Sequence, residues 1–117
     1  SFLSKNKKIK LLYPFKKGSL NYRLWKKYYN GASGLMGLRI KSSKKKVIKF
    51  VNSLKLFGYG YSWGGFESLA LHQEIREQGD RSYLNLPKDE HIVRLHIGLE
   101  DPKDLIEDLR RSLKFIK

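Results

Sequence analysis

The sequence contains no cysteine, and this absence excludes several kinds of chemistry at once. Disulfide bonds, thiolate-bound metals and thiol nucleophiles all require that residue. Because small secreted domains commonly depend on disulfides for stability, the expected compartment is the reducing cytoplasm. The chain also lacks an apolar run of the roughly 18 to 20 residues that crosses a membrane, so we expect a soluble protein with no membrane partner.

Acidic residues are missing from the first half of the chain. Residues 1–66 hold sixteen Lys or Arg and no Asp or Glu, whereas residues 67–117 hold nine basic and eleven acidic residues. Interleaved aromatic residues such as Trp25 and Tyr28 make nucleic-acid binding one interpretation. However, eighteen of the 25 basic residues are Lys, and two-pronged recognition of phosphates and bases favours Arg. The pattern therefore favours a solvated lysine-rich surface, with nucleic-acid binding as the alternative.

The length of 117 residues predicts a single domain over residues 1–117. Hydrophobic residues make up 40% and aromatic residues 13% of the chain, which predicts a packed core and excludes a disordered chain.

Hydrophobic patterning predicts alternating helices and strands in the first part of the chain. Residues 1–12 are interpreted as the tail of a helix that runs into a strand, and Ser19 as the cap of a short helix that ends near Tyr29. Residues 35–40 form a predicted strand. Ser42 and Ser43 open a predicted helix with an apolar face of Val47, Phe50, Val51 and Leu54.

The remaining elements are predicted in the same way. Residues 69–72 form a short predicted strand and residues 73–91 a long solvated connection. Residues 92–98 alternate, so that one face is core and the other polar: Val93, Leu95 and Ile97 face the core, and Ile92, Arg94 and His96 face away from it. A final helix begins at Asp101-Pro102, with an apolar stripe of Leu105, Ile106, Leu109, Leu113 and Ile116. The whole order predicts an α+β two-layer sandwich, in which a mostly antiparallel sheet carries helices on one face.

Residues 57–68 carry four glycines among aromatic residues, in the sequence FGYGYSWGGFES. Glycine at this density allows the backbone to approach a ligand or another element closely. A tight turn that joins two core strands accounts for the composition equally well. Both interpretations stay open.

Few residues form a pattern with recognisable chemistry. His72, His91 and His96 are too scattered in sequence for a zinc site, so no metal site is expected. The chain has no phosphate-binding loop, dinucleotide fingerprint or serine-nucleophile motif. Arg94, on a strand face opposite the core, either clamps a carboxylate or forms a structural ion pair with an acid in residues 100–108.

Three runs together are similar to one enzyme family. They are GYSWGGFES at residues 60–68, IVRLHIGLED at residues 92–101 followed by DLIED at 104–108, and YNGASGL at residues 29–35. In order and spacing they resemble the cystathionine β-lyases of the Cys/Met-metabolism, pyridoxal-phosphate (PLP)-dependent enzymes. The resemblance spans all 117 residues, but only as the C-terminal domain of a longer enzyme.

The resemblance implies a fold and a function. The fold is the small C-terminal domain of an aspartate-aminotransferase-like (fold type I) PLP enzyme. The reaction is cleavage of the Cβ–S bond of L-cystathionine to homocysteine, pyruvate and ammonia, in methionine biosynthesis. The implied partners are the chain's own large PLP domain, a small amino-acid substrate and, in the full-length family, the other subunits of a homotetramer.

The resemblance also assigns residues. Arg94 matches the arginine that pairs with the substrate α-carboxylate, and Ser62 and Trp63 match a pair that lines the same pocket. Tyr61 matches a tyrosine near the distal side of the substrate. Related γ-lyases and γ-synthases usually have Leu at the position of Trp63, which favours β-elimination here.

The family's Schiff-base lysine, in a Ser-x-Thr-Lys context, has no counterpart in the sequence. The chain alone is therefore expected to contain no catalytic or cofactor-binding residue, to hold no PLP and to turn over no substrate. The alternative is a stand-alone, non-catalytic remnant of a split or decayed lyase gene.

Overall fold

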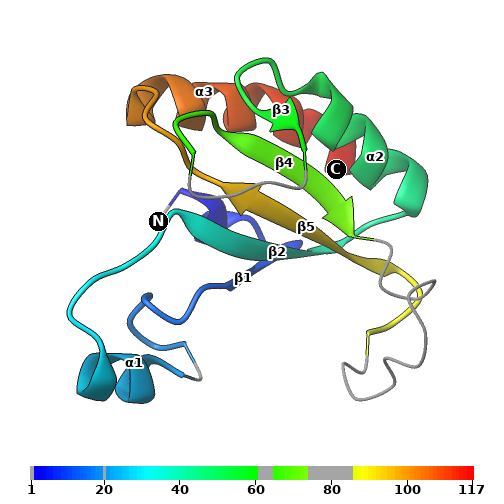
Figure 1. Ribbon diagram of the computed structural model, residues 1–117. Helices are drawn as coiled ribbons and strands as arrows, with labels where there is room; N and C mark the ends of the chain where they lie inside the picture. Colours follow the sequence, from blue (N-terminus) through cyan, green and yellow to red (C-terminus); the bar gives the residue numbers. More distant parts are fainter. Residues whose placement is uncertain (1, 20, 61–64, 74–85) are drawn as a thin grey trace.

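The structure is a computed structural model that describes residues 2–19, 21–60, 65–73 and 86–117. A five-stranded sheet forms its centre (Figure 1). The strands are β1 (Ile9–Leu12), β2 (Leu35–Lys41), β3 (Gly58–Tyr59), β4 (Leu69–Gln73) and β5 (Glu90–His96). The helices are α1 (Tyr22–Tyr28), α2 (Lys44–Ser53) and α3 (Pro102–Ser112), and short 3₁₀ turns occupy Leu3–Lys5 and Leu113–Ile116.

The sheet has the strand order β1-β2-β5-β4-β3, with β5 in the middle. Three of its junctions are antiparallel, and only β3 pairs in parallel, with β4. The sheet is therefore mostly antiparallel, as expected. Strand β5 begins at Glu90 and ends at His96, so it starts two residues earlier than the alternation of residues 92–98 predicts.

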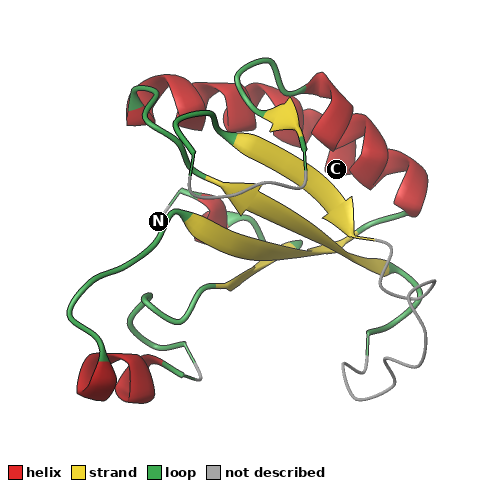
Figure 2. Ribbon diagram, viewed as in Figure 1, coloured by secondary structure: helices red, strands yellow, loops and turns green. Residues whose placement is uncertain are grey.

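Helices α2 and α3 lie together over one face of the sheet (Figure 2). Phe50 of α2 is fully buried, and so are Val93 and Leu95 of β5. Because side chains alternate along a strand, burying Val93 and Leu95 under the helices leaves Arg94 on the opposite face. The predicted core face of β5 is confirmed.

Both of these helices begin where their caps predict. The side chain of Ser43 accepts a hydrogen bond from the backbone N–H of Lys46, and the carboxylate of Asp101 accepts one from Lys103 at 2.7 Å. These acceptors satisfy backbone N–H groups that a helix leaves unpaired at its start. The predicted apolar stripe of α3 is wrong at one position, because the side chain of Ile106 is not buried but 37% exposed.

The N-terminal part differs from expectation in two places. Residues 3–5 form a 3₁₀ turn and not the end of a helix. Ser19 does not cap α1, because its hydroxyl donates to the carbonyl of Pro14 at 3.0 Å and the helix starts after Asn21 without a side-chain cap. The turn at residues 14–19 competes for the serine side chain, and this competition decides where α1 begins.

Residues 13–34, here named the arm, project from the sheet and carry α1 at their far end (Figure 1). Helix α1 has no buried residue. The ring of Phe15 contacts those of Tyr13 and Trp25 at centroid distances of 4.8 and 5.3 Å. The Trp25 indole N–H donates to the carbonyl of Gly31 at 2.8 Å. The arm is therefore held together by its own aromatic cluster.

Asp108 is a buried carboxylate on α3 that fixes the loop after α2. Its two oxygens accept hydrogen bonds from the backbone N–H of Lys55, at 3.0 and 2.9 Å, and one accepts from Leu56 at 2.8 Å. The guanidinium of Arg111 also bonds to it. Burial opposes ionisation, but the N–H donors of Lys55 and Leu56 and the charge of Arg111 outweigh it and lower the pKa of Asp108.

Within the part of the chain that the structure describes, no helix is long and apolar enough to cross a membrane.

We predict that Asp108→Asn lowers the free energy of unfolding by about 1–3 kcal/mol, because the amide group presents a donor to backbone N–H groups that need an acceptor. Urea unfolding at pH 7, followed by circular dichroism, measures the change. Glu107→Gln is the matched control, since Glu107 is exposed and pairs only with exposed Arg110; its effect stays below about 0.5 kcal/mol.

The same pair of proteins gives a pH test. A lowered pKa means that Asp108 stabilises the fold fully above its unfolded pKa of about 4, and that this contribution disappears as the pH falls through the lower folded value. The difference between wild type and Asp108→Asn therefore narrows below about pH 4. A difference that stays constant to lower pH contradicts the assignment.

Candidate functional site

Arg94 lies at the centre of the sheet, on the face away from α2 and α3. Its neighbours in register are Gly37 on β2 and Leu71 on β4. Gly37 has no side chain, and the side chain of Leu12 on β1 lies over it: a Cβ on Gly37 would stand 3.1 Å from the Leu12 Cβ. A half-buried guanidinium on the middle strand of a sheet is held more rigidly than one on a loop.

The Nη2 atom of Arg94 donates to the carbonyl of Gly60 at 3.4 Å. Arg39, on the same face, instead forms an ion pair with Glu90. Four of the five acids at residues 100–108 bond elsewhere: Asp101 caps α3, Asp108 holds the loop after α2, Glu107 pairs with Arg110 and Glu100 accepts from Ser68. None of these bonds involves Arg94, so the ion pair considered for Arg94 with these acids is not supported. The carboxylate clamp stays a prediction.

The glycine-rich segment does not form a tight turn between core strands. Gly58–Tyr59 forms the exposed edge strand β3, and it runs parallel to β4. Since a tight turn joins only antiparallel strands, that interpretation is wrong. The close-approach interpretation is supported by Gly60, whose carbonyl accepts the bond from Arg94.

The run that ends at Ser68 is bonded to the run that follows β5. Buried Ser68 donates its backbone N–H to one oxygen of Glu100 at 3.0 Å and its hydroxyl to the other at 2.7 Å. The Ser68 hydroxyl accepts from the N–H of Gly98 at 2.8 Å. The bonds from the N–H and the hydroxyl of Ser68 stabilise the ionised form of Glu100 and lower the pKa of this carboxylate.

Two further contacts join the same runs. The N–H of Leu99 donates to the carbonyl of Phe66 at 2.9 Å. Buried His96 bonds through Nε2 to the carbonyl of Gly65 at 3.1 Å. Because a carbonyl oxygen only accepts, the His96 proton resides on Nε2. A Cβ on Gly98 would stand 2.2 Å from the carbonyl oxygen of Phe66, so only glycine permits this approach.

The run at residues 29–35 also contacts the chain at the C-terminal end of β5. The carbonyl of Gly34 accepts from the N–H of Ile97 at 2.9 Å. The three runs that carry the family resemblance therefore converge at the C-terminal end of β5, although they lie far apart in the sequence.

The structure describes only one of the four predicted site residues. Arg94 lies where the strand alternation places it, whereas Tyr61, Ser62 and Trp63 lie outside the described residues. No local pattern in the sequence predicts a role for Ser68 or Gly98, and Glu100 is predicted only as one of several possible ion-pair partners of Arg94. The spacing of these three residues in the sequence does not reveal that they contact one another. The one sequence feature that could have pointed to them is that they belong to the runs that resemble the family.

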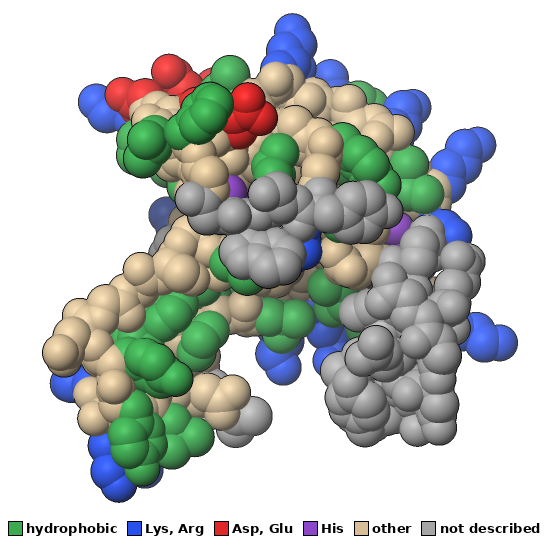
Figure 3. Space-filling view, in the orientation of Figure 1, with side chains coloured by type: hydrophobic (Ala, Val, Ile, Leu, Met, Phe, Trp, Pro, Cys, Tyr) green, Lys and Arg blue, Asp and Glu red, His purple; other side chains and the backbone are tan. Residues whose placement is uncertain are grey.

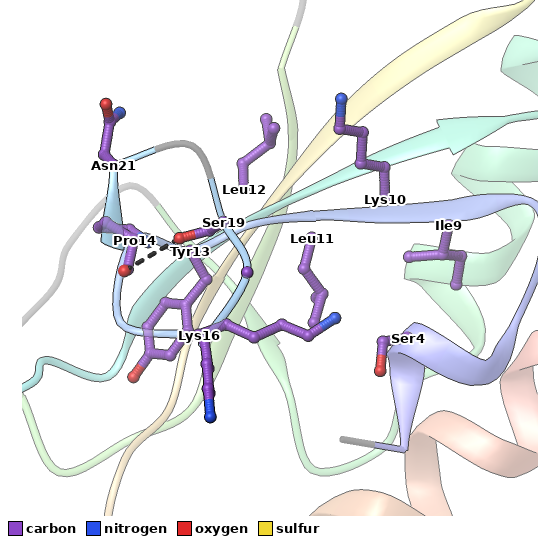
Figure 4. A pocket seen from close by; sticks show the side chains of 12 residues that line it. Ser4, Ile9, Lys10, Leu11, Leu12, Tyr13, Pro14, Lys16, Ser19 and Asn21 are labelled. Atoms are coloured by element: carbon purple, nitrogen blue, oxygen red, sulfur yellow. Dashed lines mark hydrogen bonds between the residues drawn. The ribbon is translucent and has the colours of Figure 1, made fainter. Parts of the chain in front are cut away.

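Two other features of the molecule lie apart from the Arg94 site. His72 and His91 approach to 3.3 Å between ring nitrogens, but no three His, Asp or Glu side chains among the described residues could together hold a metal ion. A hollow of about 810 Å³ lies between β1 and the turn that follows it, lined among others by Leu11, Tyr13 and Lys16 (Figure 4). It contains neither Arg94 nor the contacts at the end of β5, so it is a separate feature.

Charge on the surface is divided as the sequence indicates. The acidic side chains in view gather over one end of the molecule, near α3, whereas basic side chains are spread around its outline (Figure 3). Exposed Asp101, Asp104 and Glu107 belong to the acidic end. Nearly all the described lysines of residues 1–66 are exposed, as expected for a solvated surface.

Comparison with known proteins extends these observations. The family model of the Cys/Met metabolism PLP-dependent enzymes matches residues 1–114. A cystathionine beta-lyase of Bordetella avium is 39% identical over 105 residues, covering 90% of this chain and 26% of the relative. An L-alanine/L-glutamate racemase of Wolbachia pipientis wMel is 39% identical over 115 residues, covering 96% of this chain and 28% of the relative. A cystathionine gamma-lyase of Mus musculus is 36% identical over 120 residues, covering 97% of this chain and 29% of the relative.

Among solved structures, cystathionine gamma synthase from Xanthomonas oryzae pv. oryzae, in complex with aminoacrylate and cysteine, superposes with a TM-score of 0.83. It is 24% identical, and the match covers 97% of this chain and 30% of that one, so it shows the fold. The chain spans less than a third of the length of these relatives. With the family model over almost its whole length, and with its three family-like runs packed together, the chain belongs to the Cys/Met metabolism PLP-dependent enzyme family.

Proposed function

We propose that the chain is the C-terminal, substrate-carboxylate-binding domain of a longer, cytoplasmic PLP-dependent cystathionine β-lyase. In this proposal the two-layer arrangement of sheet and helices is the small domain, and the large domain supplies the cofactor site. The observation that carries the proposal is Arg94, a half-buried guanidinium on the middle strand, next to the Gly60 end of the glycine-rich segment.

A guanidinium suits this role for a physical reason. Its planar fork donates two parallel hydrogen bonds to a carboxylate, which fixes the orientation of the amino acid as well as its position. Because β5 is paired on both sides, the backbone of Arg94 does not have to reorganise when the substrate binds. The proposed task of the domain is therefore to orient the amino acid before the bond is cleaved.

The other substrate contacts in the proposal come from the family resemblance. The hydroxyl of Ser62 and the backbone N–H of Trp63 provide donors to the same carboxylate, and Tyr61 lies on the distal side of the substrate. Arg94 alone does not separate a lyase from a racemase such as the Wolbachia relative, because the amino-acid substrates of both carry an α-carboxylate. Trp63 is the residue that favours the β-lyase.

The residues present fit the substrate's carboxylate and do not fit PLP itself. The chain has no threonine, and therefore no Ser-x-Thr-Lys motif for the Schiff base. When bound to a complete enzyme, PLP supplies the electron sink for bond cleavage. In the proposal that site lies in the large domain of a homotetrameric enzyme, and the 117-residue chain alone neither holds PLP nor releases pyruvate. The alternative remains a stand-alone, non-catalytic remnant.

We predict that Arg94→Leu in the longer enzyme lowers the catalytic efficiency of pyruvate release from L-cystathionine by the equivalent of about 2–5 kcal/mol, because the carboxylate is left buried without its partner. Arg94→Lys keeps the charge but loses the two-pronged geometry, so its loss is intermediate. Arg110→Leu is the matched control, since Arg110 is exposed and pairs with Glu107. An Arg94→Leu enzyme with unchanged efficiency overturns the assignment, and L-alanine racemisation measured on the same samples tests the racemase directly.

A second prediction concerns the native polypeptide. Blotting of cell extract with antibody raised against this chain should detect a band several times heavier than 13.7 kDa, because the relatives are several times longer. A single band at 13.7 kDa supports the remnant and removes Arg94 from catalysis.

A further inference from the structure

Glu100 connects two parts of the molecule that bear on the Arg94 site. It lies four residues after His96, the end of β5, and directly precedes Asp101, the N-cap of α3. Both of its carboxylate oxygens accept bonds from Ser68, one from the backbone N–H and one from the hydroxyl. A carboxylate that accepts two bonds from one residue fixes the orientation of that residue as well as its distance.

Ser68 in turn uses every hydrogen-bonding group it has. Its N–H and hydroxyl donate to Glu100, its hydroxyl accepts from Gly98, and its carbonyl accepts from the N–H of Gly58 at 2.9 Å. Gly58 lies two residues before Gly60, the residue whose carbonyl bonds Arg94. Ser68 therefore fixes both ends of the glycine-rich segment, and Glu100 fixes Ser68.

The chain on either side of Glu100 supports the same contact. Leu99 donates to Phe66, His96 bonds Gly65, and Gly98 leaves no room for a side chain against Phe66. Residues 96–100 thus form a cradle for residues 65–68. Within this cradle Glu100 is the member that makes two charge-assisted bonds, and such bonds are stronger than those between neutral groups.

We propose that Glu100 is a positioning residue, which holds Ser68 so that the Gly60 carbonyl stands at the guanidinium of Arg94 and sets its orientation. Glu100 acts through Ser68 and Gly58 and does not itself contact the substrate. The inference rests on the proposed function for its consequence, carboxylate binding, but the link from Glu100 to Arg94 is a property of the ligand-free chain.

The test uses nuclear magnetic resonance on the ¹⁵N-labelled 117-residue chain. Glu100→Ala should speed hydrogen exchange of the Ser68 amide by about tenfold or more and shift the Arg94 Nε–H and Gly60 amide signals without ligand. Glu100→Gln keeps the shape and one carbonyl acceptor, so it should restore part of both effects. Glu107→Ala, an exposed carboxylate on α3, is the matched control and should leave these signals in place.

A purely local role for Glu100 gives a different result. If Ser68 exchange rises while the Arg94 and Gly60 signals stay unchanged, the proposal is overturned. Should Glu100→Ala unfold, Ser68→Ala serves instead, since it removes only the hydroxyl that joins Glu100 to Gly98. Circular dichroism establishes that each variant is folded, and a shift of the Arg94 signal in folded Ser68→Ala supports the proposal.

The proposed function is tested separately by adding L-cystathionine as the probe. Wild-type chain should show a saturable shift of the Arg94 Nε–H signal, and Glu100→Ala should bind about tenfold more weakly. Absence of any response in the wild type counts against carboxylate binding, whereas the ligand-free comparison still decides whether Glu100 positions Arg94. Equal affinity of wild type and Glu100→Ala overturns the role of Glu100 in binding.

Discussion

The alternation of side chains along β5 is the constraint on which the candidate site depends. Val93 and Leu95 are fully buried beneath the helices, and this burial holds the strand in one register. A slip by one residue would move the apolar pair to the opposite face and Arg94 beneath the helices, where an unpaired guanidinium is very costly. Hydrophobic packing on one face therefore decides where the charged group stands on the other.

Two carboxylates fix the conformation of loops, as the packing of β5 fixes the position of Arg94. Asp108 accepts backbone N–H groups from the loop after α2, and Glu100 accepts the N–H and hydroxyl of Ser68. Loops carry polar backbone groups that need partners when they are buried, and an ionised acceptor satisfies them strongly. Among the described acids of a chain with eleven acids against 25 basic residues, Asp108 and Glu100 serve as internal anchors, and Glu100 connects to the proposed substrate site through Ser68 and the segment that contains Gly60.

The arm, unlike the sheet and the helices that cover it, is held together by local contacts and not by the hydrophobic core. Its helix has no buried residue, and Leu24, Tyr28 and Tyr29 are each more than half exposed. Contacts among Tyr13, Phe15 and Trp25 and the two side-chain bonds to the carbonyls of Gly31 and Ser33 hold it together locally. Lys26 and Lys27 of α1 are exposed, which agrees with a solvated role for the lysines of the arm.

Local features of the sequence were sufficient for the elements that depend on local physics. Ser43 and Asp101 cap their helices as predicted, and the alternation in β5 placed Arg94 correctly, because caps and periodicity depend on neighbouring residues. The prediction that Ser19 caps α1 was wrong, because the Ser19 hydroxyl donates a hydrogen bond to the carbonyl of Pro14 instead. The parallel pairing of β3 and the bonds of Ser68 to Glu100, thirty-two residues apart, were decided only by the tertiary structure. Contacts at such separation leave no periodic signal in one sequence, and they form only once the sheet has brought the runs together.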